Sequence, residues 1–70
     1  MVVYEILKAE EGQLPERIGK PSSDSGVIRR RIKRMEEEGQ DLSKIWIIIY
    51  TWKDGALTAN VVESSDFEEA

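Results

Sequence analysis

The chain has 70 residues, with 14 acidic and 10 basic side chains and a net charge of -4 at pH 7. It contains no Cys and no His, which excludes disulfides and a Cys/His zinc site, and we predict neither a metal site nor a cofactor. This length is close to the limit at which one hydrophobic core offsets the loss of chain entropy. We therefore expect one small domain over residues 1–63 and an acidic, disordered tail over residues 64–70.

The charges are distributed unevenly along the chain. Residues 17–34 hold seven basic side chains against one acidic side chain, a local charge of +6, whereas residues 63–70 hold four acidic side chains. Without the residues of this acidic end, the ten basic and ten acidic side chains of the rest of the chain cancel. The chain as a whole is therefore not a general polyanion binder, but the basic cluster predicts one defined anionic contact.

The first residues can be interpreted in two ways. Residues 2–9 contain enough apolar side chains for a short helix, yet they alternate and are β-branched as in a strand, and periodicity cannot separate the two in so short a run. There is no basic leader and no long apolar segment, so we predict a cytoplasmic protein without a membrane contact.

The next segment, Leu14–Ile18, has the features of a helix start. Pro15 suits the first helical position, and Glu16 suits the positive end of the helix dipole. Gly19 and Pro21 then stop the helix after little more than one turn.

Residues 26–39 form the clearest predicted helix. Ile28, Ile32 and Met35 recur at the spacing that places them on one helix face. Polar residues in front supply N-cap oxygens, and Gly39 suits the position after the last turn. The intervening basic residues must then form a dense charged surface, and they are Arg29, Arg30, Arg31, Lys33 and Arg34.

A hairpin is predicted after this helix. Residues 45–52 are the most apolar run in the chain and are rich in β-branched and aromatic residues, which indicates a strand. Asp54-Gly55 supplies a two-residue turn, and residues 57–62 return as the second strand. This register places Trp46, Ile48, Tyr50 and Trp52 on one face, and both faces of the first strand are apolar.

The spacing Ile28-x₃-Ile32-x₂-Met35-x₃-Gly39, with basic residues between, resembles the third helix of winged helix-turn-helix transcription regulators. The resemblance implies that residues 4–8 and Leu14–Ile18 are the first two helices and that the hairpin is the wing. It further implies an α+β fold of three helices followed by a β-hairpin, in which the third helix enters the major groove of DNA and Lys53 lies near the backbone or minor groove.

Together these features predict a small DNA-binding regulator or accessory protein that binds double-stranded DNA. Its main contacts would be Arg29, Arg30, Lys33 and Arg34, and its secondary contacts Arg31, Lys20 and Lys53. We predict no enzymatic activity, because the commonest general base and the most nucleophilic side chain are both missing.

The alternative is a non-enzymatic protein-interaction or inhibitor module of β-α-β-β fold. Residues 2–8 would then be a strand beside residues 45–52, with one helix on a three-stranded sheet, and the basic helix or the second sheet face would bind a protein partner.

Self-association is a further expectation. One layer of helices covers only one face of the hairpin, so a homodimer is predicted to bury the other face. The alternative is a monomer in which residues 2–8 cover that face within one chain. The predicted interface consists of Trp46, Ile48, Tyr50 and Trp52.

Overall fold

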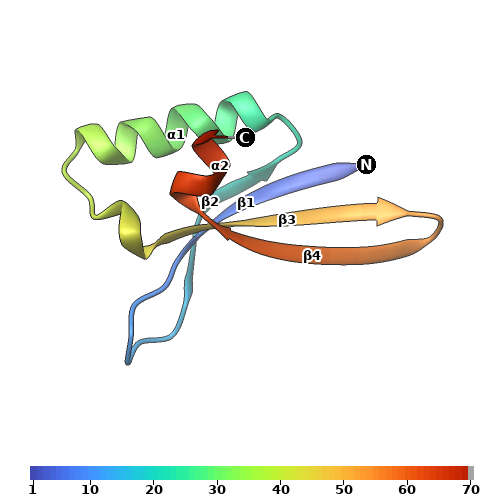
Figure 1. Cartoon of the computed structure of the whole chain (residues 1–70), viewed down its shortest axis with the longest axis horizontal. Helices are drawn as coiled ribbons and strands as arrows, with labels where there is room; N and C mark the ends of the chain where they lie inside the picture. Colours follow the sequence, from blue (N-terminus) through green and yellow to red (C-terminus); the bar gives the residue numbers. More distant parts are fainter. Residues whose placement is uncertain (70) are drawn as a thin grey trace.

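The computed structural model describes residues 1–69 of the chain, with side chains up to Phe67. The elements in chain order are β1 (Val2–Lys8), β2 (Glu16–Ser22), α1 (Ser25–Glu37), the 3-10 turn η1 (Leu42–Lys44), β3 (Ile45–Lys53), β4 (Ala56–Glu63) and α2 (Ser64–Glu69). The four strands form one antiparallel sheet in the order β2-β1-β3-β4. Both helices lie on the same side of this sheet (Figure 1).

The winged-helix prediction is wrong, because residues 2–8 are a central strand and not a helix. β1 pairs with β2 on one side and with β3 on the other, and its ladder with β3 runs without interruption from Val2–Thr51 to Lys8–Ile45. The β-α-β-β alternative placed residues 2–8 beside β3, but it lacked one strand of the sheet. The local sequence of residues 2–8 is compatible with a helix or a strand, and pairing with the distant strand β3 determines that they form a strand.

The helix expected at Leu14–Ile18 is also absent, and β2 occupies Glu16–Ser22 instead. β2 lies at the edge of the sheet, where Pro21 costs no hydrogen bond to a further strand. Gly19 has a φ of +74°, and the β1–β2 register shifts between Tyr4 and Ile6. The residues that were expected to end a helix therefore mark an irregular edge strand.

The predicted central helix is present as α1. The Asp24 carboxylate caps its first turn by accepting a hydrogen bond of 2.8 Å from the Gly26 amide. At the other end Gly39 has a φ of +83° and donates to the Glu36 carbonyl, while the Gln40 amide donates to the Met35 carbonyl. This pair of bonds is the Schellman arrangement that a glycine after the last turn permits.

The hairpin is present with the predicted register. Asp54 and Gly55 have φ values of 52° and 78°, as a two-residue type I′ turn requires. The ladder between β3 and β4 is regular from Lys53–Ala56 to Trp46–Glu63.

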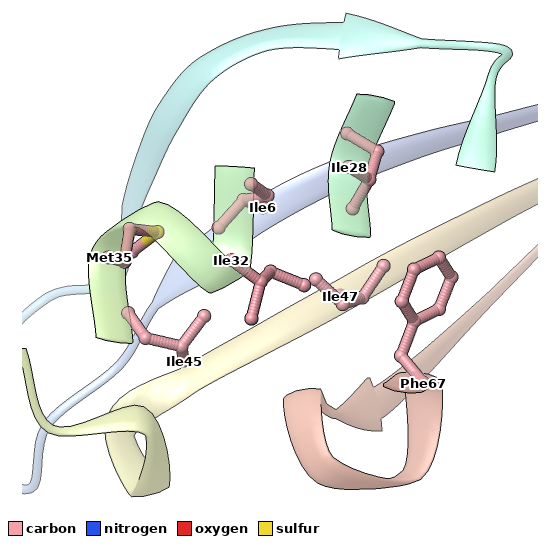
Figure 2. Packing of buried hydrophobic residues seen from close by; sticks show 7 residues of the cluster. All are labelled: Ile6, Ile28, Ile32, Met35, Ile45, Ile47 and Phe67. Atoms are coloured by element: carbon pink, nitrogen blue, oxygen red, sulfur yellow. The ribbon is translucent and has the colours of Figure 1, made fainter. Parts of the chain in front are cut away.

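One hydrophobic core lies between the sheet and the helices. Its members come from β1, α1, β3 and α2 and converge from both sides (Figure 2): Ile6, Ile28, Ile32, Met35, Ile45, Ile47 and Phe67. The acidic end, predicted to be disordered, contributes to this core, because residues 64–69 form α2 and Phe67 is only 5% exposed. The remainder of the predicted tail, residue 70, lies outside the described residues.

Because Phe67 fills the core and meets the Tyr4 ring edge-on at 5.4 Å, Phe67→Ala should destabilise the protein. We expect a loss of about 3 kcal/mol in the free energy of unfolding, measured by urea denaturation. Ser65→Ala, at an exposed position of the same helix, is the control and should change stability little. Equal stability of the two variants would mean that α2 contributes nothing to the fold.

Candidate functional site

The outer face of α1 carries a dense cluster of positive charge. Ile28, Ile32 and Met35 point into the core, so the basic positions between them lie on the solvent side. Four of these side chains are exposed and form what we call the basic stripe: Arg29, Arg30, Lys33 and Arg34. The structure thus gathers the four residues predicted as main DNA contacts on one helix face.

The predicted secondary contacts have different surroundings. Arg31 is half-buried, and its Nη1 donates a hydrogen bond of 2.6 Å to the carbonyl oxygen of Lys20, which ties α1 to β2. Lys20 therefore lies beside the helix. Lys53 borders the β3–β4 turn, at the end of a hairpin that extends beyond the helices, and it is not part of the basic stripe (Figure 1).

One member of the stripe also touches α2. The guanidinium carbon of Arg29 lies 5.3 Å from the centroid of the Phe67 ring, a cation–π contact. Arg29 thus has a structural contact, whereas no ion pair between described residues joins Arg30, Lys33 or Arg34 to a carboxylate.

Helix stability does not explain this arrangement of charges. The N-terminal end of a helix favours acidic side chains and the C-terminal end basic ones. Asp24 at the N-cap and Arg34 in the last turn follow this rule, but α1 has no acidic residue in its first turn, and Glu36 and Glu37 lie at its C-terminal end. Arg29 and Arg30, in the N-terminal half, therefore gain no stability from the helix dipole.

The opposite face of the sheet is not covered by either helix. Alternate side chains of β1, β3 and β4 project from it and are mostly apolar, and we call this surface the open face. The four predicted dimer contacts all lie on it: Trp46, Ile48, Tyr50 and Trp52. Trp52 is 42% exposed, and Leu57 opposite Trp52 and Val61 opposite Ile48 are each 55% exposed.

A buried carboxylate lies within the open face. Glu5 is 5% exposed, accepts a hydrogen bond of 3.0 Å from the Tyr50 hydroxyl and pairs with the Arg17 guanidinium at 3.5 Å. Hydrogen bonding to Glu5, together with partial burial, raises the pKa of Tyr50. Sequence reasoning missed this cluster, although an acidic residue inside the apolar run of β1 is the signal that could have indicated it.

The described residues form an open depression but contain no membrane-spanning helix and no group of metal ligands. No three acidic side chains among them are grouped to hold a metal ion, and none of the described helices is long and apolar enough to cross a membrane. An open depression between the end of α1, η1 and α2 is lined by Leu42, by two glutamates and by serine hydroxyls.

Comparisons with protein-family models, with curated proteins and with solved structures gave no match to this chain. The basic stripe and the open face are therefore interpreted from their own chemistry.

The Tyr50–Glu5 contact predicts a specific titration. The raised pKa of Tyr50 depends first on the hydrogen bond to Glu5 and also on the Glu5 charge, so Glu5→Gln, which replaces the charged acceptor with a neutral amide, should lower this pKa toward the ordinary tyrosine value. In the wild type the stability from this contact is complete below the unfolded-state pKa of about 10 and is lost as the pH rises through the folded-state pKa.

Carbon-13 shifts of the Tyr50 ring, followed by NMR against pH, measure this pKa directly. Glu36→Gln, an exposed change on α1, is the control and should leave the titration of Tyr50 unchanged. An identical Tyr50 titration in Glu5→Gln and in the wild type would contradict the assignment.

Proposed function

We propose that this protein is a small, non-enzymatic DNA-binding protein that contacts the phosphates of double-stranded DNA through the basic stripe of α1. The observation that carries the proposal is the exposed set Arg30, Lys33 and Arg34, which has no carboxylate partner among the described residues. Guanidinium groups bind phosphate oxygens through two parallel hydrogen bonds, which favours a phosphate ligand over a single carboxylate.

The dimensions of the stripe support this ligand. Residues 29–34 extend about 8 Å along the helix axis at 1.5 Å per residue. Each DNA strand places a phosphate about every 3.4 Å along its axis, so the stripe is long enough to reach two or three phosphates.

The surrounding charges define the extent of the contact. Glu36–Glu38 follow the stripe directly, and α2 adds further acidic residues, so only the basic part of α1 can approach DNA closely. Phosphate contacts position a protein on DNA but carry no sequence information by themselves. The proposal is therefore a backbone contact, because the winged-helix geometry that implied base reading is absent.

Removing two guanidinium groups from the stripe tests the proposal. The double variant Arg30→Gln, Arg34→Gln should bind duplex DNA more weakly, and the slope of log affinity against log salt should fall by about 2, since each lost phosphate contact removes about 0.9. Fluorescence anisotropy at several salt concentrations measures both quantities.

The matched control is Lys8→Gln, Lys44→Gln, which changes the net charge by the same amount at two residues outside α1 that are not predicted DNA contacts. We expect this control to keep the wild-type slope. Equal losses in the two double variants would show that net charge alone governs binding, and no binding of the wild type at low salt would refute the proposal.

A second candidate function, binding of a protein partner, is favoured by the open face. Three large apolar side chains of this face are exposed, Trp52 at 42% and Leu57 and Val61 at 55% each. Contiguous exposed apolar side chains are typical of an interaction site. This candidate and DNA binding use opposite sides of the sheet.

A photoreactive benzoylphenylalanine at position 52 tests the second candidate. Trp52 lies on the open face, so this replacement should crosslink a distinct protein in cell extract. The same residue at position 33, on the basic stripe, is the control and should not crosslink that protein. Crosslinks that are identical from the two positions, or absent from position 52, would contradict the second candidate.

A further inference from the structure

The two edges of the sheet differ in how they are protected. An edge strand exposes unpaired backbone groups, and proteins ordinarily block such strands with Pro, Lys or a bulge. β2 has all three kinds of protection, because it contains Pro21, Lys20 and the irregularity at Gly19. In addition, the Lys20 carbonyl is already bonded to Arg31.

The other edge, β4, has none of these features. Its sequence from Ala56 to Glu63 contains no Pro, no Lys and no Arg, and its ladder with β3 has no register shift. Residues 56–61 are all exposed, and β4 lies on the part of the sheet that extends beyond the helices (Figure 1). β4 is thus a long, regular and largely apolar edge that is open to a further strand.

The turn determines which backbone groups of β4 are free. In a two-residue hairpin the residues that flank the turn form a hydrogen-bonded pair, and here these residues are Lys53 and Ala56. Along an antiparallel ladder, hydrogen-bonded pairs alternate with pairs that are not hydrogen-bonded. The even-numbered residues of β4 therefore bond to β3. The amides and carbonyls of Leu57, Ala59 and Val61 point toward the free edge.

The geometry points to a second copy of this chain as the occupant, with the two β4 strands paired antiparallel about a two-fold axis. The free groups of one β4 then face those of the other, so that Ala59 lies opposite Ala59 or Val61 of the second copy. The two four-stranded sheets become one sheet of eight strands. This inference is independent of DNA binding and of any partner of the open face.

The charge distribution of β4 and the blocked β2 edge both favour a second copy of this chain as the occupant. Glu63, the only charged residue of β4, lies at one end of the strand, so the antiparallel arrangement holds the two Glu63 side chains far apart. Because β2 is blocked, pairing through β4 ends at two copies and cannot continue into a fibre. Both copies of α1 would lie on the same side of the joined sheet, which places two basic stripes on one surface.

Charge exchange at Asn60 tests the inference. The Asn60 side chain lies on the helix side of β4, away from the open face, and it is exposed. If Ala59 lies opposite Val61 of the second copy, the two Asn60 side chains lie directly opposite each other. If Ala59 lies opposite Ala59, the two Asn60 side chains are diagonal neighbours. Asn60→Lys or Asn60→Glu alone should therefore dissociate the dimer, and an equal mixture of the two variants should restore it.

Sedimentation equilibrium at high micromolar concentration measures the outcome. The wild type and the mixture should show twice the chain mass of 8.0 kDa, and each single variant should show the chain mass. Circular dichroism of each variant checks that it is folded. In the wild type, amide exchange at Leu57, Ala59 and Val61 should slow as the concentration rises.

Several results would overturn the inference. These are a wild type that stays monomeric, single variants that stay dimeric, or a mixture that stays monomeric. Trp52→Glu provides the comparison for a dimer formed through the open face. If Trp52→Glu dissociates the dimer and Asn60→Lys does not, the open face and not β4 joins the two copies.

Discussion

Hydrogen bonding of β1 between β2 and β3 is the constraint on which the rest of the structure depends. β1 comes from the start of the chain, and its ladder with β3 joins residues more than 35 positions apart in sequence. Once this ladder forms, β2 can pair only at the free side of β1, and α1 must cross back over the sheet to reach β3. The position of the core between α1 and the sheet follows from this connection.

Burial on only one side of the sheet gives the protein two surfaces of different chemistry. On one side, Ile28 and Ile32 are fully buried, which turns the basic residues of α1 outward. On the other side, no helix covers the aromatic residues of β3, and the open face remains. A small chain has too few helices and strands to cover both faces of its sheet. Helices on one face therefore leave the apolar surface of the other face available to another molecule.

The polar residues adapt to this arrangement. Glu5 would be costly at a buried position in the central strand if it had no partner, and Tyr50 and Arg17 supply its hydrogen bond and its countercharge. Arg31 similarly has a structural contact, because its guanidinium bonds to the β2 backbone. Arg30, Lys33 and Arg34 have no comparable contact with the side chains that the structure describes, which is why they carry the proposal of an anionic ligand.

The sequence by itself determined the elements whose signals are local. The 3.6-residue period of Ile28, Ile32 and Met35 with their caps predicted α1, and the Asp-Gly turn between apolar runs predicted the hairpin and its register. The same period placed the basic stripe on the outer face of the helix. These predictions succeed because neighbouring residues alone specify helix periodicity and turn conformation.

Only the tertiary structure decided the remainder. Residues 2–8 are compatible with a helix or a strand, and pairing with β3 chose the strand. Leu14–Ile18 resembles a helix start, but the free edge of β1 made this segment part of an edge strand, where Pro21 is tolerated. Phe67 stands in an acidic segment with no periodicity, and only the space at the end of the core explains its burial. Each of these outcomes depends on contacts between residues distant in sequence, which propensity and spacing do not contain.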